Sequence, residues 1–527
     1  MACLMTLDDS IWLTRFASPM GEIEIDGESL TLEQALAIAK GSATASLSSS
    51  SRGKMQQSRE AVDKVVSSDE VVYGINTGFG ALSSVSIDKD ELEMLQTNLV
   101  RSHACGIGKR MDPENVLLMM VIRANSLAKG VSGARPELVE LMLSMANSRI
   151  APVVPRIGSL GASGDLAPLS HMTMGMMGEG DCLRLVEGEW CCTDSLTALE
   201  EANLTPIKLQ AKEGLSLING TSQMCAYLIR TVLNMEILTL VADASIACSL
   251  EAIRGSHKPF DKRIHESRPQ FGQSISAARI SELLSNSQIV LSHVDCDRVQ
   301  DAYCFRCSPQ VHGPVIDLLR EVRRMLEIEI NSATDNPLVF VDSNGSAEII
   351  SGGNFHGQNL ALASDSIAIA CHELASISER RINQILDPNW SGQKAFLAEN
   401  EGLESGLMIV QYVAAAVIAE LHLLANPATT SNIPVSMGKE DHVSMGATGT
   451  YRAMQSSLLL SQVLANELIC STEALDGIDE APGGGVSKVT AWVRSHVGKL
   501  DGDRSLTVEC ENLSEAILNG DMTSIFG

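Results

Sequence analysis

Aromatic residues are scarce in this chain of 527 residues, which has only 4 Trp, 5 Tyr and 9 Phe. Cores built from sheets rely on aromatic and β-branched side chains, so this scarcity argues against a β-sandwich and favours packed helices. Basic residues are also few, since 39 Lys and Arg stand against 65 Asp and Glu and give a formal net charge of −26. A nucleic acid or an anionic membrane needs a basic face, so this balance argues against both partners.

The sequence predicts neither a disulfide framework nor a signal peptide. Its 13 cysteines have no regular spacing, and an odd number is typical of free thiols in a reducing compartment. Cys304 and Cys307 form a CxxC pair with no second pair nearby, so we expect no metal there. Residues 1–16 contain no basic segment followed by an apolar run, so no signal peptide is predicted. These features predict a cytoplasmic protein.

One apolar stretch, residues 407–425, is long enough to raise the question of a membrane span. It contains Gln411, Glu420 and His422, which the hydrocarbon core of a bilayer holds only at a cost. We therefore interpret this stretch as a buried helix of the protein core.

The first part of the chain predicts a mixture of strands and helices. Residues 22–25 alternate in polarity like a strand, and Thr31 with Gln34 forms a capping box that opens a helix ending at Gly41. Residues 42–53 are rich in serine and are interpreted as a low-complexity loop. Further elements are predicted as helices over 113–129 and 136–148 and a strand pair over 183–191 around Gly188.

Beyond residue 205 the pattern changes to long helices with few breakers. They are predicted over residues 222–254, 315–331, 356–386 and 406–424, and a hairpin with an Asn344-Gly345 turn interrupts them at 338–350. The sequence therefore predicts a mainly α fold. It consists of a smaller mixed α/β domain over residues 1–205 and an elongated helical-bundle domain over residues 206–527.

Residues 151–171 form an irregular segment with several glycines and prolines. The simplest interpretation is a glycine-rich loop that leads into a helix opened by Asp165. A phosphate-binding loop requires Gly-Lys-Ser/Thr, which is absent here. A nucleophile elbow requires Gly-x-Ser-x-Gly, and the residues flanking Ser163 do not fit that pattern.

A further interpretation uses the chemistry of Ala162, Ser163 and Gly164, which we call the triplet. In a tight turn the amide nitrogen of Gly164 can reach the carbonyl carbon of Ala162, because glycine has no Cβ to prevent close approach. Ring closure releases one water, and loss of the Ser163 hydroxyl releases a second. The product is a five-membered ring with an exocyclic methylene. This electrophile can capture an amine and make ammonia a better leaving group, so the triplet predicts an ammonia-lyase.

Residues 158–171, Gly-Ser-Leu-Gly-Ala-Ser-Gly-Asp-Leu-Ala-Pro-Leu-Ser-His, resemble the signature of the aromatic amino acid ammonia-lyase family. This family includes lyases for histidine, phenylalanine and tyrosine and related aminomutases. Further segments resemble family blocks in the family order, at residues 73–80, 219–221, 300–306, 334–337, 353–357 and 440–445. The resemblance implies that the triplet forms 4-methylidene-imidazol-5-one (MIO) without an external cofactor. It also implies a homotetramer whose active sites are shared between subunits.

The resemblance assigns roles to residues outside the triplet. It places Tyr73 over the reacting carbon as a general acid/base, and Asn219 beside the prosthetic ring. It assigns Arg306 to the substrate carboxylate, which a guanidinium can bind in a bidentate manner. Gln300, Tyr303 and Asn336 complete the polar lining, and Phe355 packs against the loop. The base that removes the β-proton is left open among Tyr73, Tyr303 and Glu440.

His103 and Glu440 bear on the choice of substrate. The Ser102-His103 pair resembles members that act on histidine, and a carboxylate at position 440 can accept a hydrogen bond from an imidazole N–H. The alternative for Glu440 is a charge at a helix N-terminus, which suits any substrate. Lys439 and Gln358 depart from the family pattern. A tyrosine or phenylalanine lyase or aminomutase, or an inactive helical scaffold, therefore stays open beside a histidine-specific lyase.

Overall fold

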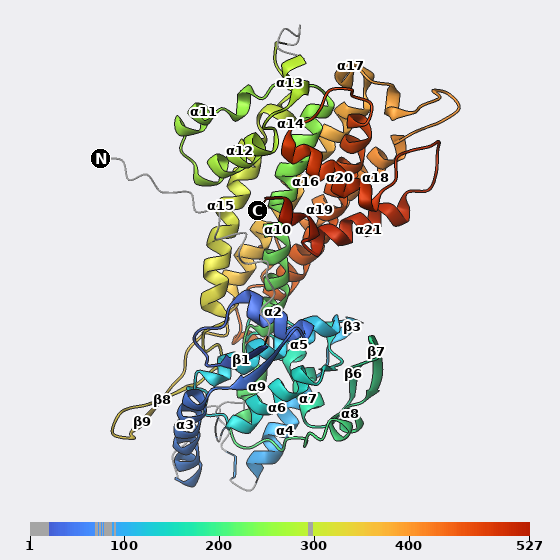
Figure 1. The fold of residues 1–527 in the computed structure, drawn as a ribbon. Coiled ribbons are helices and arrows are strands. Elements are labelled where there is room, and N and C mark those ends of the chain that lie inside the picture. The colour runs from blue at the N-terminus through green and yellow to red at the C-terminus, as the bar shows by residue number, and fades with distance from the viewer. Residues whose placement is uncertain are drawn as a thin grey trace.

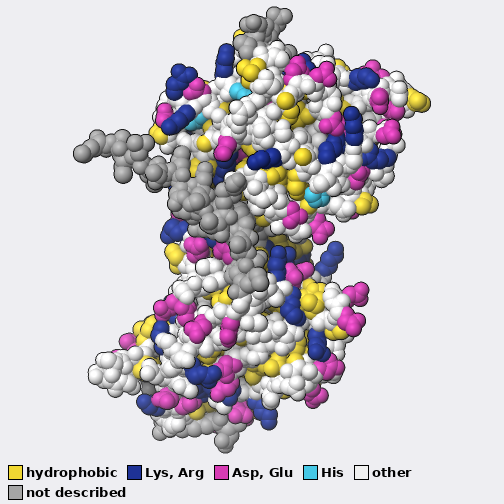
Figure 2. Space-filling model, in the orientation of Figure 1, with side chains coloured by type: hydrophobic (Ala, Val, Ile, Leu, Met, Phe, Trp, Pro, Cys, Tyr) yellow, Lys and Arg dark blue, Asp and Glu magenta, His cyan; other side chains and the backbone are white. Residues whose placement is uncertain are grey.

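The computed structural model describes residues 21–68, 72, 75, 77, 87–88, 91–292 and 299–526. The molecule is elongated, with the N-terminal elements at one end and several long helices running to the other end (Figure 1). Lysines and arginines are interspersed with acidic side chains over the face shown in Figure 2. The predicted mainly α fold, with a mixed α/β region near its N-terminus, is confirmed.

The first elements follow the predicted order with one error. β1 (Gly21–Ile25) precedes α2 (Leu32–Lys40), whose capping box at Thr31 and Gln34 and left-handed Gly41 are present as expected. The predicted low-complexity loop is wrong, because its residues form β2 (Ala43–Leu47) and the start of α3 (Ser49–Ser67). β2 pairs in parallel with β1. The hydrogen bonds between the two backbones therefore stabilise a strand that its small side chains do not predict.

The remaining elements of the N-terminal end surround the segment that contains the triplet. The predicted helices are present as α5 (Pro113–Ala128) and α6 (Pro136–Asn147), and the predicted strand pair as β6 (Asp181–Val186) and β7 (Glu189–Asp194). The others are α4 (Leu92–His103), β3 (Ile107–Arg110), β4 (Ile150–Pro152), β5 (Pro155–Ile157), α7 (Leu166–Met176), α8 (Ser195–Glu201) and α9 (Glu213–Ile218).

Four long helices run through the middle of the molecule and contribute a large share of its core (Figure 1). They are α10 (Ser222–Ala252), α15 (Ser308–Glu329), α16 (Gln358–Leu386) and α19 (Gly446–Leu475). By length and composition α10 and α16 match membrane-spanning helices, yet most of each apolar segment is buried inside the protein. Packing against neighbouring helices therefore accounts for their apolar character.

Shorter helices complete the far end of the molecule. They are α11 (Lys262–Glu266), α12 (Phe271–Leu283), α13 (Gln288–Ser292), α14 (Tyr303–Arg306), α17 (Pro388–Ser391), α18 (Met408–Leu424), α20 (Gly484–His496) and α21 (Thr507–Leu518). α18 corresponds to the apolar stretch that we expected to be buried, and that expectation is wrong for one face. Val410, Ala414, Val417 and Leu421 are buried, whereas Tyr412 is 64% exposed among other exposed apolar residues.

The predicted hairpin is present as β8 (Leu338–Val341) and β9 (Ala347–Ile350). Val339 packs with Val62 of α3 in a small core of its own, so this hairpin lies against the N-terminal end of the molecule (Figure 1). A segment of the predicted helical-bundle domain therefore packs against the predicted N-terminal domain. The division at residue 205 stays a prediction.

Candidate active site

The triplet lies in a turn between β5 and α7. Ala162 is 5% exposed and Gly164 is also buried, while Ser163 is partly exposed. Ser159 braces this turn, since its Oγ donates to the Gly164 carbonyl oxygen at 3.1 Å and accepts from the Gly161 amide at 3.0 Å. The turn is thus both tight and internally bonded.

Gly164 lies directly against Gly220, which precedes α10. The two residues form a parallel bridge, and the Asp165 amide donates to the Gly220 carbonyl oxygen at 2.7 Å. Gly164 has a left-handed φ of +75°, and a Cβ placed on it would overlap the Gly220 backbone. Only glycine fits this position, because it tolerates the dihedral angle and the close approach together.

Asn219 contacts the triplet from the same side. Its Nδ2 donates to the Ser163 carbonyl oxygen at 2.6 Å, and the residue is 3% exposed. Its side-chain Oδ1 is buried without a hydrogen-bond partner within the described residues. An unpaired buried acceptor is costly, so this oxygen is available to a donor from outside the chain.

Asp165 was expected to open α7, and it occupies the N-cap position without making the capping hydrogen bond. Its carboxylate reaches a different helix, where it accepts from the amides of Gln223 and Met224 at 2.8 and 3.1 Å. These amides belong to the first turn of α10, so Asp165 ties the triplet loop to the start of that helix. Burial raises the pKa of Asp165 to about 7 and outweighs the opposing effect of its hydrogen bonds.

This raised pKa predicts a pH dependence of stability. An unfolded aspartate has a pKa near 3.8, so the folded state binds more protons between that value and 7. The contribution of Asp165 to the free energy of unfolding is therefore present at low pH and falls as the pH rises through this window. We expect Asp165→Asn to show a shallower loss of melting temperature between pH 5 and pH 7 than the unsubstituted protein.

The control is Asp261→Asn, because hydrogen bonds to Arg263 lower the pKa of Asp261 to about 2, below that pH range. The change of melting temperature with pH in Asp261→Asn should match that of the unsubstituted protein. An unchanged slope for Asp165→Asn would contradict the raised pKa.

A distant segment holds the other side of the triplet loop. Ser444 Oγ donates to the Gly161 carbonyl oxygen at 2.9 Å, and the Met445 amide donates to that of Leu160 at 2.8 Å. Glu440 lies in the same segment, bridged to Val435, and Val435 packs against the small apolar cluster that contains Ala162. α19 begins only at Gly446, so the interpretation of Glu440 as a charge in the first turn of a helix is wrong.

Asn336 and Phe355 lie on neighbouring segments. The Oδ1 of Asn336 accepts from Ser351 Oγ at 3.1 Å and from the Gly352 amide at 2.6 Å. This connects it to the segment that contains the half-buried Phe355. The segment continues to Gly357, whose amide donates to the Gly161 carbonyl oxygen at 3.1 Å. Both residues are therefore tied to the triplet loop through the backbone.

His103 ends α4, and its Nδ1 lies 2.8 Å from the Leu99 carbonyl oxygen. A carbonyl can only accept, so Nδ1 carries a proton, and in the neutral tautomer with this proton Nε2 is an acceptor. The next residues approach the triplet loop, since the Gly106 backbone lies close to Gly158. The Gly106 amide also donates to His171 Nε2 at 3.1 Å.

Three residues with predicted roles lie elsewhere. Gln300 is exposed, Tyr303 is 70% exposed, and Arg306 stacks over the Tyr303 ring at 4.4 Å. They lie on or beside α14, at the opposite end of the molecule from α7 (Figure 1). A single chain therefore does not bring them to the triplet. Tyr73 lies outside the described residues.

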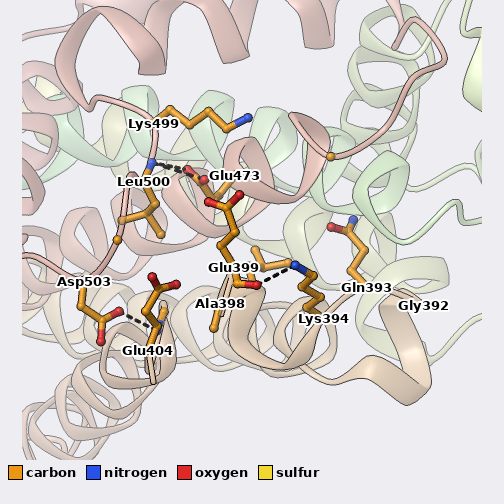
Figure 3. Close-up of a pocket in the computed structure, with 14 residues that line it drawn as sticks. Gly392, Gln393, Lys394, Ala398, Glu399, Glu404, Glu473, Lys499, Leu500 and Asp503 are labelled. Carbon is orange, nitrogen blue, oxygen red and sulfur yellow. Dashed lines mark hydrogen bonds between the residues drawn. The ribbon is translucent and has the colours of Figure 1, made fainter. Parts of the chain in front are cut away.

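A separate hollow of about 440 Å³ lies among the C-terminal elements (Figure 3). Charged side chains line this hollow, but several of them already make hydrogen bonds to the protein backbone. Glu473 accepts from the Leu500 amide, Lys394 donates to the Glu399 carbonyl oxygen, and Asp503 accepts from the Gly406 amide. None of the residues with predicted roles lines this hollow.

Sequence reasoning missed Arg123, which contacts the Asn219 backbone. Its Nη1 donates to the Asn219 carbonyl oxygen at 3.0 Å, and its side chain is wholly buried. A signal was present, because residues 116–128 of α5 are apolar on almost every face and Arg123 is their only charge. A helix that is apolar all round is buried, so a single charge within it has to find partners inside the protein.

Comparison with known proteins agrees with this arrangement. The model of the aromatic amino acid lyase family matches residues 30–495. Histidine ammonia-lyase of Myxococcus xanthus is 46% identical over 501 residues, covering 95% of this chain and 97% of that protein. The chain belongs to the aromatic amino acid lyase family.

Solved structures of similar fold include enzymes with different activities. The histidine ammonia-lyase from Trypanosoma cruzi is 37% identical with a TM-score of 0.88, covering 96% of this chain and 95% of that one. The tyrosine aminomutase from Streptomyces globisporus is 34% identical with a TM-score of 0.89, covering 96% and 98%. Fold similarity therefore does not by itself distinguish the two activities.

Proposed function

We propose that this chain is a cytoplasmic histidine ammonia-lyase, which eliminates ammonia from L-histidine and releases trans-urocanate. The observation that carries the proposal is the contact of Asn219 with the Ser163 carbonyl, in a triplet turn that only glycine at 164 permits. The names of the similar proteins support the choice of reaction. This reaction is the non-oxidative first step of histidine degradation.

The residues around the triplet fit its conversion to MIO. The Ser163 carbonyl oxygen is retained in the ring, and the Asn219 amide that donates to it at 2.6 Å would polarise the ring. When formed, MIO supplies the electrophile that captures the substrate amine. The chain's other residues bind the substrate and move its protons. A tyrosine serving as base would need its pKa lowered by neighbouring groups.

The substrate choice rests on His103 and Glu440. The free Nε2 of His103 and the carboxylate of Glu440 both accept hydrogen bonds, which an imidazole ring can donate and a phenyl ring cannot. Both residues are partly buried, and an acceptor that a bound phenyl ring covers without pairing it would cost about 1–3 kcal/mol. These two residues therefore favour histidine over phenylalanine.

We further propose that the active enzyme is a homotetramer with sites shared between subunits. Arg306 and Tyr303 are too far along the molecule to reach the triplet of their own chain (Figure 1). The exposed apolar face of α18, which includes Ile409, Tyr412 and Leu423, is typical of a surface that another subunit covers. Association of copies would then bring an Arg306 to the triplet of another chain.

The direct test is incubation of the purified protein with L-histidine while the near-ultraviolet absorbance of urocanate is followed. Production of urocanate supports the proposal. Cinnamate or coumarate from phenylalanine or tyrosine, with no product from histidine, would instead identify another member of the family. An intact mass that retains both waters of the triplet would favour an inactive scaffold.

Glu440→Gln tests the substrate assignment. We expect kcat/KM for L-histidine to fall roughly 10- to 100-fold, because the amide is a weaker acceptor for an imidazole N–H. Loss of two waters from the triplet should be unaffected. Asp441→Asn is the matched control, since Asp441 is the exposed neighbouring carboxylate. Equal losses in both variants, or none in Glu440→Gln, would contradict the role of Glu440.

A further inference from the structure

Arg123 stands out because its burial has no evident benefit for stability. Its Nε and Nη2 have no hydrogen-bond partner within the described residues, and Nη2 lies 3.8 Å from the Asp335 carboxylate. Burial lowers the pKa of this guanidinium, which Asp335 only partly opposes. Buried ion pairs of imperfect geometry are weak contributors to stability, so a functional reason for Arg123 has to be considered.

Arg123 touches the backbone segment on which the triplet rests. Its Nη1 donates to the Asn219 carbonyl oxygen at 3.0 Å, and a Cβ on Gly220 would overlap that same nitrogen. Gly164 packs against Gly220 just as closely. The Gly220 backbone is therefore held between the guanidinium of Arg123 and the last residue of the triplet.

The same guanidinium is linked to the segment before Asn336. Arg123 Nη1 lies 3.3 Å from Thr334 Oγ1, and the Asp335 carboxylate accepts from Lys212 Nζ at 3.2 Å. The side chains of Arg123, Lys212 and Asp335 are all fully buried. This cluster, which we call the buried charge cluster, is therefore a rigid connection between residues 219–220 and residues 334–336.

We propose that Arg123 is a positioning residue for formation of the prosthetic ring, an inference that rests on the proposed conversion of the triplet to MIO. Ring closure requires the Gly164 nitrogen to bond to the Ala162 carbonyl carbon. The carbonyl oxygen leaves as water with the amide protons of Gly164 and Ser163. The Ser163 hydroxyl then leaves as a second water with the Cα proton. Arg123 fixes the backbone of Asn219 and Gly220, and Gly220 packs against Gly164. Arg123 therefore keeps Gly164 in the tight turn in which its nitrogen can bond to the Ala162 carbonyl carbon.

The proposal distinguishes Arg123 from Lys212, which lies in the same cluster. The Nζ of Lys212 donates to the Ser132 carbonyl oxygen, Ser216 Oγ and Asp335, and within the described residues these hydrogen bonds do not involve residues 219–220. Replacing either cation leaves Asp335 with the other cation and with Ser132, whose Oγ donates to Asp335 Oδ1 at 2.8 Å, so the two substitutions carry a similar risk for folding. Of these two cations, Arg123 is the one that contacts residues 219–220, against which the triplet packs.

The experiment compares Arg123→Met, Arg123→Lys and Lys212→Met by intact mass, with the melting temperature of each variant recorded. We expect Lys212→Met to have lost two waters like the unsubstituted chain. Most chains of soluble Arg123→Met should retain both waters, and Arg123→Lys should be a mixture. If Arg123→Met does not fold, the intact mass of Arg123→Lys tests the proposal instead. Loss of two waters from every chain of Arg123→Lys would then overturn the proposal.

Two other outcomes also overturn it. One is complete ring formation in Arg123→Met. The other is an equal defect in Arg123→Met and Lys212→Met, which would indicate a general effect of the buried charge cluster. The unsubstituted chain provides the separate check on the proposed function. If it retains both waters, the conversion itself is contradicted, whereas loss of both waters without urocanate contradicts only the substrate.

Discussion

Ser163→Ala is expected to lower kcat for L-histidine by roughly 10³-fold or more, the scale of loss when the central group of a covalent mechanism is removed. Alanine has no hydroxyl to leave as the second water, so the exocyclic methylene cannot form. The variant should keep its fold, because the Ser163 contact in this turn is made by its backbone carbonyl. Its intact mass should show that the methylene-forming water has not been lost.

Ser170→Ala is the matched control for this substitution. Ser170 is a buried serine of α7 whose Oγ donates to the Leu166 carbonyl oxygen at 2.7 Å. Its substitution by alanine therefore also removes a buried serine hydroxyl, seven residues after Ser163 in the sequence. The control should lose two waters and retain activity. Substantial urocanate production by Ser163→Ala would exclude the triplet as the source of the electrophile.

Activity should be recovered when two inactive variants share one oligomer. Arg306→Met alone is expected to lose roughly 10²-fold or more of kcat/KM, because the substrate carboxylate loses its charged partner. Arg306 and the triplet lie at opposite ends of one chain (Figure 1). Co-expression of Arg306→Met with Ser163→Ala should therefore assemble some sites with an intact residue of each kind. Random mixing in equal amounts restores about a quarter of the sites.

The control combination is Ser163→Ala with Asn219→Ala. Asn219 contacts the Ser163 carbonyl of its own chain at 2.6 Å, so every mixed site still lacks one of the two groups. No recovery is expected there. Recovery in the control, or none in the Arg306 mixture, would contradict the shared site. The urocanate assay on oligomers purified with two different tags measures both cases.

Elements with local signals were predicted well, and one without such a signal was missed. The capping box at Thr31 and the Asn344-Gly345 turn are encoded by neighbouring residues, and both are present. β2 was missed because Ala and Ser, which make up three of its five residues, give little strand signal, and its regular structure comes from pairing with β1. α18 was expected to be buried because its hydropathy is high, yet hydropathy does not say whether the covering surface belongs to the same chain.

Candidate site residues were found where they belong to recognisable motifs. Asn219 and Glu440 were proposed from short blocks, and the structure places both segments against the triplet loop. Arg123 was not proposed, because its contact with Asn219 joins residues 96 positions apart. Asp165 opens α7 as predicted, but its side-chain contacts were not foreseen, since its partners at 223 and 224 are remote in the sequence.

The sequence by itself determined the chemistry that this chain can carry. The atoms of the ring come from three adjacent residues, and the identity of those residues is a local property of the chain. The tertiary structure decided what surrounds them: Gly220 pressed against Gly164, Arg123 behind it, and Arg306 at the far end of the molecule. Covalent connectivity fixes which residues form the triplet. The surroundings of the triplet depend on packing between remote segments, which no local pattern of residues encodes.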